Sequence, residues 1–244
     1  MSTPRFFVDA PLDAGARLAL PERVAHHALR VLRLAPGAAL VIFNGRGGEA
    51  RADLEIDGPR AWARISQWSP IERESMLELT LIQAIVAADK LDWVIEKATE
   101  LGAARIVLVA AARSVVRLSG ERLERRLQHG REIALAACAQ CGRNRVPVIE
   151  AAASLAAACT ASTARRRYVL APQADSLGLQ VSIGESIAFA VGPEGGYTPD
   201  ELATALAASF APLSLGPRVL RTETAGLAAL AACQALAGGW GAPG

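Results

Sequence analysis

Short apolar runs alternate with segments of helical periodicity from residue 77 onward, and this alternation constrains the fold more than any other feature. The apolar runs that resemble buried strands cover residues 77–86, 105–110, 146–149, 168–171, 187–191 and 213–215. Helical patterns cover residues 91–101, 121–139 and 223–236, and the alanine-rich stretch 151–164 is typical of a helix and a loop. Because alternating strands and helices build a parallel sheet covered by helices, the sequence predicts an α/β domain over residues 71–244.

Residues 1–70 predict a separate, small β domain. Three strand-like runs occupy residues 38–44, 49–56 and 60–68, and turn residues interrupt them at Asn44-Gly45 and Asp57-Gly58-Pro59. A helix is expected over residues 22–32. Ser69-Pro70 marks the expected boundary between the two domains.

Two glycine-bearing loops follow predicted strands near the end of the chain. Residues 191–197 read VGPEGGY, and residues 215–225 read LGPRVLRTETA. Ligands bind at the carboxyl ends of strands in α/β sheets, and glycine allows the main chain to approach a ligand closely. The two loops therefore predict one pocket that is built mainly from main chain.

The pocket is not expected to hold a polyphosphate. The first loop lacks both the ending of a P-loop and the glycine spacing of a dinucleotide site. Thr198, Pro199 and Glu201 form a predicted capping box at the start of the next helix. The carboxylate would occupy the positive helix end where a phosphate would otherwise bind.

Six motifs together resemble the SPOUT methyltransferases, and specifically the bacterial ribosomal small subunit methyltransferase E group. Two of them are GPEGGYTPDE and LSLGPRVLRTETA, which contain the two loops. The others are HALRVLR at 27–33, KLDWVIEKATELG at 90–102, RSVV at 113–116 and AQCGR at 139–143. The resemblance extends over most of the chain.

This resemblance implies methylation of N3 of a uridine in 16S rRNA, with S-adenosylmethionine as the methyl donor. It implies a SPOUT α/β domain with a C-terminal trefoil knot over residues 71–244, and a PUA-like RNA-binding β-barrel over residues 1–70. It also implies a homodimer, with the helix at 223–236 at the interface. The implied cofactor-binding residues are Leu170, Ala171, Pro172, Val191, Gly192, Pro193, Glu194, Gly195, Gly196, Leu215, Gly216, Arg218, Val219 and Leu220.

Arg221 and Glu223 are the candidate catalytic residues. Uracil N3 carries a proton, so the reaction needs a proton acceptor or stabilisation of the developing anion. Arg221 would stabilise that anion or hold a phosphate. Glu223 would accept the proton, or alternatively interact with the helix dipole at a helix start. The residues do not decide which group is the general base.

Positive charge is concentrated between residues 113 and 145, although the whole chain carries a net charge of only +2. This stretch has eight arginines against three glutamates, which fits contacts with RNA phosphates or an ordinary solvated helix face. The candidate RNA-binding residues are His27, Arg30, Arg33, Arg113, Arg122, Arg125, Arg126, Arg143 and Asn144.

The remaining features predict a cytoplasmic protein without a metal site. No stretch has the roughly 18 apolar residues of a membrane span, and the first residues lack the apolar core of a signal peptide. Cys138 and Cys141 form a lone CxxC, which is more typical of small buried residues than of a zinc site. Two alternatives stay open: a SPOUT enzyme that acts on tRNA or on a ribose 2′-OH, and a noncatalytic RNA-binding homologue.

Overall fold

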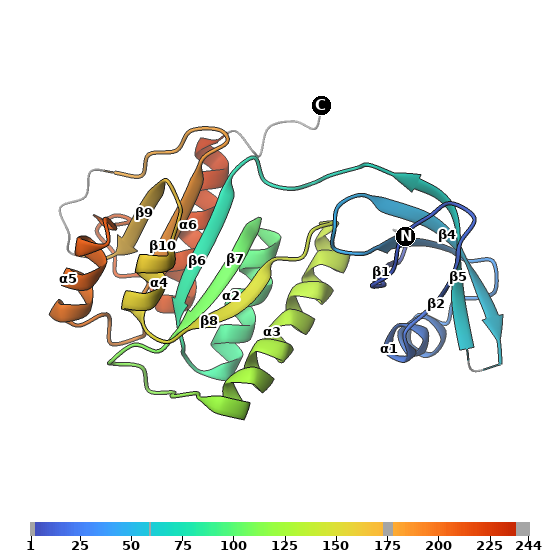
Figure 1. Ribbon diagram of the computed structural model, residues 1–244, viewed down its shortest axis with the longest axis horizontal. Helices are drawn as coiled ribbons and strands as arrows, with labels where there is room; N and C mark the ends of the chain where they lie inside the picture. Colours follow the sequence, from blue (N-terminus) through green and yellow to red (C-terminus); the bar gives the residue numbers. More distant parts are fainter. Residues whose placement is uncertain (1–2, 59, 173–177, 238–244) are drawn as a thin grey trace. The chain divides into compact units, whose positions relative to one another are not determined.

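A computed structural model describes residues 3–58, 60–172 and 178–237 of the chain (Figure 1). The chain divides into two compact units. The first unit consists of Met1–Glu74 and Cys138–Val146, and the second consists of Ser75–Ala137 and Pro147–Gly244. The first unit thus combines two segments that are distant in the sequence.

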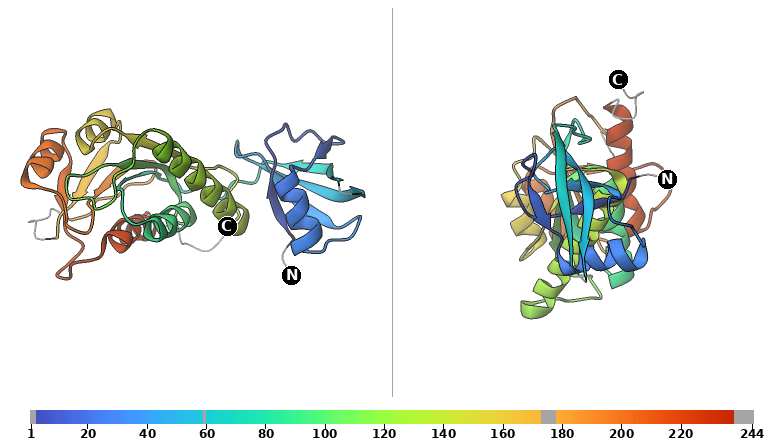
Figure 2. Two further views of the ribbon diagram at one scale, coloured as in Figure 1. Left: turned by 90° about the horizontal axis from the view of Figure 1, so that it is seen from below. Right: turned by 90° about the vertical axis from the view of Figure 1, so that its right-hand side faces the viewer.

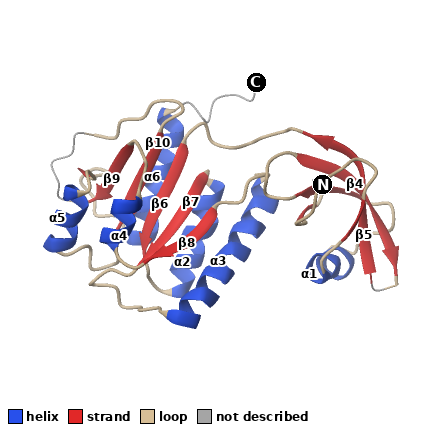
Figure 3. Ribbon diagram, in the orientation of Figure 1, coloured by secondary structure: helices blue, strands red, loops and turns tan. Residues whose placement is uncertain are grey.

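A five-stranded sheet forms the first unit (Figure 3). Its strand order is β1 (Arg5–Phe7), β3 (Ala39–Phe43), β4 (Glu49–Asp57), β5 (Arg60–Ser69) and β2 (Arg17–Ala19). β1 pairs with β3 in parallel, and the other neighbours are antiparallel. Large apolar side chains of the core include Phe6, Leu40, Ile42, Leu54 and Ile65. The three predicted strands are confirmed, whereas β1 and β2 are too short to show an alternating pattern.

The predicted helix at 22–32 is present but changes its geometry midway. Helix α1 (Glu22–His26) continues into a π-helical turn, η1 (His27–Val31). The N–H of Leu32 donates to the carbonyl of His27 at 2.9 Å, and the chain leaves the turn at Arg33, whose φ is 52°. π-Turns inside helices are rare and occur frequently at functional sites.

Hydrogen bonds from Arg5, which also forms an ion pair with Glu49, connect residues 138–146 to the rest of the first unit. Glu49, at the start of β4, accepts hydrogen bonds from Arg5 and from Arg73, the latter at 2.8 Å. Arg5 also donates to Oδ1 of Asn144 at 2.7 Å. Burial by itself would raise the pKa of Glu49, but the hydrogen bonds from Arg73 and Arg5 outweigh it and lower the pKa from 4.5 to about 2.

We expect the first unit to lose stability as the pH falls from about 4.5 towards about 2, because Glu49 has a lower pKa in the folded protein. Its contribution is complete above the ordinary pKa and disappears as the folded carboxylate is protonated. Linkage limits the loss to about 3 kcal/mol. Urea unfolding at pH 7 and pH 3 measures it. Glu49→Gln should reduce the difference between the two pH values, and an unchanged difference would contradict this assignment.

The second unit contains a six-stranded sheet in which every pair of neighbours is parallel. Its strand order is β11 (Ala211–Leu213), β9 (Arg166–Leu170), β10 (Ser186–Val191), β6 (Glu78–Ala84), β7 (Ala103–Val109) and β8 (Val148–Ala152). The predicted α/β domain with a parallel sheet is therefore confirmed.

Helices cover both faces of this sheet (Figure 2). The helices are α2 (Ala88–Glu100), α3 (Gly120–Cys141), α4 (Leu155–Ala161), α5 (Pro199–Ala207) and α6 (Thr222–Leu236). α4 and α5 share a core with side chains of one face, including Ile82 and Val169. α6 packs on the other face together with α2, and Gly226 lies directly against Leu81 and Val191. No helix of the described residues is long and apolar enough to cross a membrane.

Candidate functional site

Strands β9, β10 and β11 end at the same edge of the parallel sheet. Just beyond β9, the N–H of Ala171 donates to the carbonyl of Leu213 at 3.0 Å. The hydroxyl of Ser214 donates to the carbonyl of Pro172 at 3.2 Å. Residues 170–172 and 213–216, which are distant in sequence, are thus brought together, and residues 192–196 follow the neighbouring strand β10.

The first loop, residues 192–196, is tightly packed at its start, where a side chain would require neighbouring main chain to shift by a few tenths of an ångström. A Cβ on Gly192 would lie 3.1 Å from the main-chain nitrogen of Tyr197. The predicted capping box is confirmed beside it, because Thr198 and Glu201 exchange hydrogen bonds at the start of α5. Glu201 also accepts a hydrogen bond from the N–H of Ala112 at 2.8 Å. A carboxylate therefore occupies this helix start.

The second loop, residues 215–220, presents main chain and apolar side chains. Gly216 has a φ of 102°, which an L side chain rarely adopts, and no atom lies within 4 Å of the position a Cβ would take. Val219 is 73% exposed, and Leu215 and Leu220 are half-buried. An open main-chain position beside apolar side chains is suited to the uncharged part of a ligand.

A buried hydrogen-bond relay connects the first loop to the start of α6. Nε2 of Gln83, at the end of β6, donates to the hydroxyl of Thr222 at 3.0 Å. The Thr222 hydroxyl donates in turn to the carbonyl of Gly192 at 2.6 Å. Gln83 is completely buried. This relay connects the first turn of α6, and with it the main chain of Arg221 and Glu223, to the first loop.

Charged side chains gather at the same edge. Nζ of Lys90, near the start of α2, lies 3.0 Å from Oε1 of Glu194 and 3.8 Å from Oε2 of Glu223. That oxygen of Glu223 is buried and accepts no hydrogen bond from the described residues. Arg221 precedes α6 as its N-cap and is exposed. Both candidate catalytic residues therefore lie beside the predicted cofactor loops.

Lys90, Gln83 and Thr222 contact the candidate site residues, although none of them was among the predicted site residues. Lys90 and Thr222 lie within two of the quoted motifs, and Thr222 lies between the two catalytic candidates. Gln83 lies at the carboxyl end of β6, where ligands bind in α/β sheets. None of these three residue types is diagnostic of methyl transfer on its own.

The candidate RNA-binding residues fall into two groups. His27 and Arg30 are exposed on the π-turn, Arg33 is exposed just after it, and Arg122 and Arg125 are exposed on α3. The others make internal contacts. Arg113 is also exposed, but it donates to the carbonyl of Gly195 at 3.0 Å and so supports the first loop.

Arg126, Arg143 and Asn144 have structural partners. Arg126, with a side chain only 10% exposed, pairs with Asp92 of α2. Arg143 is 4% exposed, and its guanidinium donates to Glu74 at 3.0 and 2.6 Å. Asn144 is completely buried, and its amide donates to the carbonyl of Ile71 at 2.7 Å. These contacts account for the three residues without RNA.

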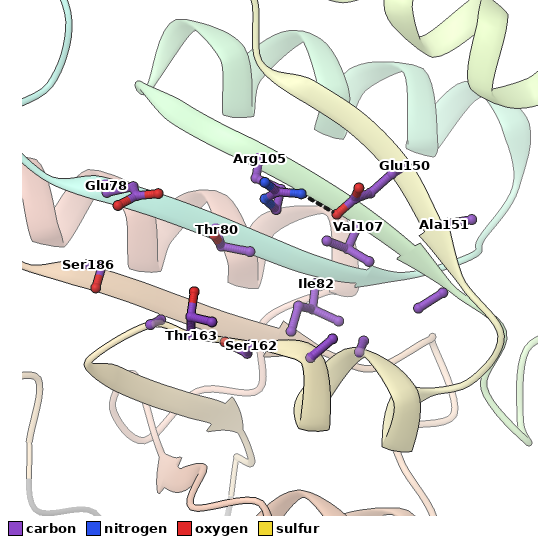
Figure 4. A pocket seen from close by; sticks show the side chains of 14 residues that line it. Glu78, Thr80, Ile82, Arg105, Val107, Glu150, Ala151, Ser162, Thr163 and Ser186 are labelled. Atoms are coloured by element: carbon purple, nitrogen blue, oxygen red, sulfur yellow. Dashed lines mark hydrogen bonds and ion pairs between the residues drawn. The ribbon is translucent and has the colours of Figure 1, made fainter.

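A separate cavity of about 440 Å³ lies on the face of the sheet that α4 covers, away from these loops (Figure 4). An ion pair between Arg105 and Glu150 borders it, and its floor includes Ile82 and Val107. No residue of the predicted cofactor site lines it. Its one cation, Arg105, is paired with Glu150.

The described residues contain no cluster of three or more His, Cys, Asp or Glu that would hold a metal ion. Cys138 is buried and Cys141 is half-buried. Burial raises the pKa of the Cys138 thiol to about 12, which disfavours the thiolate needed for nucleophilic attack or metal binding.

Comparisons with known proteins place both units in the context of RNA modification. Residues 73–234 match the model of an RNA methyltransferase domain, and residues 20–66 match that of an RNA methyltransferase PUA domain. The chain is 34% identical to ribosomal RNA small subunit methyltransferase E of Mycobacterium bovis, covering 97% of this chain and 93% of that protein.

Two solved structures are similar over nearly the whole chain. A putative methyltransferase from Legionella pneumophila with bound cofactor S-adenosylmethionine superimposes with a TM-score of 0.92 at 32% identity, covering 97% of this chain and 99% of that chain. A ribosomal RNA small subunit methyltransferase E from Neisseria gonorrhoeae, bound to S-adenosylmethionine, has a TM-score of 0.85 at 35% identity, covering 97% and 98%.

Proposed function

The chain belongs to the ribosomal RNA small subunit methyltransferase E family, and from this membership we propose that it methylates N3 of a uridine in 16S rRNA with S-adenosylmethionine as methyl donor. The observation that carries the proposal is the meeting of three predicted cofactor segments at one sheet edge, beside Arg221 and Glu223. Similarity over nearly the full length supports the same activity.

The residues at the sheet edge fit an adenosine-containing cofactor. Main chain of residues 192–196 and around Gly216 would contact its polar edges, and Leu170, Leu215 and Leu220 would contact its apolar surface. The capping box leaves no free helix start for a phosphate. When bound, S-adenosylmethionine supplies an electrophilic methyl group on a sulfonium.

Arg221 and Glu223 act on the uridine in this proposal. Transfer to N3 requires that the N3 proton leaves and that negative charge on the uracil is stabilised. Oε2 of Glu223 has no hydrogen-bond donor among the described residues, and in this proposal the carboxylate of Glu223 accepts that proton. The planar guanidinium of Arg221 would donate to a uracil oxygen and stabilise the charge.

The two parts of the chain would have different functions. Residues 1–70 would bind RNA as a PUA-like domain, and residues 71–244 would form the methyltransferase domain with a C-terminal trefoil knot. The substrate would be 16S rRNA, within the assembled small subunit, and the protein would act in the cytoplasm.

A homodimer is part of the proposal and is supported by α6. No charged side chain occurs after Glu223 in this helix, and its Ala228, Ala231 and Ala232 are half-buried within the chain. Leu236 is 60% exposed. A second copy of the chain would cover this apolar surface. Light scattering tests it, and an active monomer would exclude the dimer.

Methylation of small subunits that lack the modification tests the proposed function. Purified protein and labelled S-adenosylmethionine are incubated with these subunits, and the modified nucleoside is identified by mass spectrometry. 3-Methyluridine in 16S rRNA is the expected product. A methylated ribose or a methylated tRNA would indicate another RNA substrate, and cofactor binding without transfer to any RNA would indicate a noncatalytic homologue.

Gly216→Val should weaken binding of S-adenosylmethionine by at least about tenfold, or about 1.4 kcal/mol. Valine does not readily adopt a φ of 102°, so the second loop must change shape. Gly184→Val is a matched control, because Gly184 has a φ of 79°, equally open surroundings and a place at the opposite end of β10. Calorimetry measures both, and equal affinities in the two folded variants would remove the loop from the site.

Replacing Arg122 and Arg125 together with alanine should weaken RNA binding and flatten its salt dependence, because fewer counterions are released. Both side chains are exposed on α3, whereas Arg126 is held by Asp92 and is left unchanged. The affinity for S-adenosylmethionine should stay constant. Filter binding at several salt concentrations provides the measurement, with Arg165→Ala as an exposed control. An unchanged salt slope would identify this stretch as an ordinary solvated surface.

A further inference from the structure

One ammonium group lies between two carboxylates that come from different parts of the sequence. Nζ of Lys90 is 3.0 Å from Oε1 of Glu194 and 3.8 Å from Oε2 of Glu223. Their side chains are 27%, 39% and 17% exposed, so water only partly screens the three charges. Lys90 therefore connects the first cofactor loop to the first turn of α6.

The pair with Glu194 is a defined hydrogen bond. It is the main cause that raises the pKa of Lys90 above its ordinary value. A main-chain hydrogen bond and the bond from Lys90 also hold the pKa of Glu194 below its ordinary value. Both groups stay ionised around neutral pH, so this contact of the loop does not depend on pH in that range.

The contact between Lys90 and Glu223 is an ion pair at 3.8 Å, which is longer than a hydrogen bond. Oε2 of Glu223 is buried and receives no hydrogen bond from the described residues, and Lys90 is the cation the structure places beside it. Without this cation, two carboxylates would share the space and repel each other. A buried carboxylate that loses its counter-charge is costly and tends to move towards water. Lys90 thus determines where the carboxylate of Glu223 lies relative to Arg221.

We propose that Lys90 is a positioning residue for methyl transfer, which holds the cofactor loop through Glu194 and orients Glu223 for the uridine. This inference rests on the proposed function. It assigns two separable effects to one side chain, cofactor affinity through Glu194 and turnover through Glu223. The fold itself does not depend on Lys90, because the buried relay from Gln83 through Thr222 to Gly192 independently connects α6 to the loop.

The test compares Lys90→Met with a control on the same helix. Lys97 bonds two carboxylates, Glu96 and Glu100, at 2.7 Å each, so Lys97→Met removes a similar ammonium without touching the site. Lys90→Met should weaken S-adenosylmethionine binding about tenfold and lower kcat at saturating cofactor about tenfold or more. Lys97→Met should leave both within about twofold. Lys90→Arg, which keeps the charge, should recover most of both losses.

Double variants separate the two effects. Glu194→Gln should reproduce the loss of affinity, and adding it to Lys90→Met should weaken binding no further. Glu223→Gln should lower kcat while affecting affinity little. If Lys90→Met equals Lys97→Met in affinity and kcat, or if its loss of affinity adds fully to that of Glu194→Gln, the proposal is wrong.

The outcome is distinguishable from failure of the proposed function. A wild-type protein that binds S-adenosylmethionine but methylates no RNA would refute the function, while calorimetry would still decide whether Lys90 and Glu194 act together. Thermal unfolding of each variant identifies any that does not fold. If Lys90→Met is among them, Lys90→Arg and Glu194→Gln still decide the matter: affinity unchanged by Glu194→Gln would overturn the proposal.

Discussion

Arg221→Lys is expected to lower kcat by about 100-fold, while the affinity for S-adenosylmethionine stays nearly unchanged; loss of one donor to a developing anion typically has an effect of this size. Arg221 is exposed, and no hydrogen bond or ion pair within the described part of the chain engages its guanidinium. Its donors are therefore available to a substrate. Lysine keeps the charge but replaces the planar fork by a single ammonium on a flexible stem, so it should position the uracil poorly.

Single-turnover methylation gives the rate, and calorimetry gives the cofactor affinity. Arg165→Lys is a suitable control, because this arginine is exposed and lies at the start of β9, opposite the edge where the loops meet. Turnover at the wild-type rate in Arg221→Lys would remove the guanidinium from the mechanism. Equal losses of rate and affinity would instead place Arg221 in the cofactor site.

The second large effect concerns stability. Arg143→Ala should lower the free energy of unfolding by about 3–5 kcal/mol, because it leaves the carboxylate of Glu74 without its main partner. Arg143 is 4% exposed and donates to Glu74 at 3.0 and 2.6 Å. The cost should appear in urea unfolding monitored by tryptophan fluorescence.

Arg145 provides the matched control, two residues further along. Its side chain is 58% exposed, and it pairs with Glu72 at 3.3 Å. Exposed ion pairs contribute at most about 1 kcal/mol, so Arg145→Ala should cost far less than Arg143→Ala. Similar small losses in both variants would show that the buried pair does not stabilise the first unit.

Periodicity predicted the parts of the fold that long, regular elements determine. The parallel sheet of the second unit and the helices packed on it follow from apolar runs and helical faces, and the structure confirms them. β1 and β2 have three residues each, so no pattern identifies them. The π-turn at His27–Val31 was also not predicted, because its hydrogen-bond geometry leaves the helical pattern almost unchanged.

The parts of the candidate site that are formed by main chain could be predicted from the sequence. The side-chain pairs around them could not. Glycine spacing located both loops because a positive φ or a close approach demands glycine. Which side chains form ion pairs with each other cannot be seen in the sequence in the same way. An arginine in a basic stretch looks the same whether it faces RNA, as the exposed Arg122 would, or binds a buried carboxylate, as Arg143 does.

The split composition of the first unit has a consequence for its synthesis. Arg5 donates to the carbonyls of Gly142 and Arg143 and to the side chain of Asn144, so an amino-terminal residue depends on chain made more than 130 residues later. During translation, this unit cannot complete its polar contacts until residue 146 has left the ribosome, when β6 and β7 of the second unit's sheet have also left it but its other four strands have not. Recombination between related genes is restricted in the same way. Replacing residues 1–74 alone by those of a relative would separate Arg5 and Glu74 from their partners at residues 142–144. The two units are therefore expected to be inherited together.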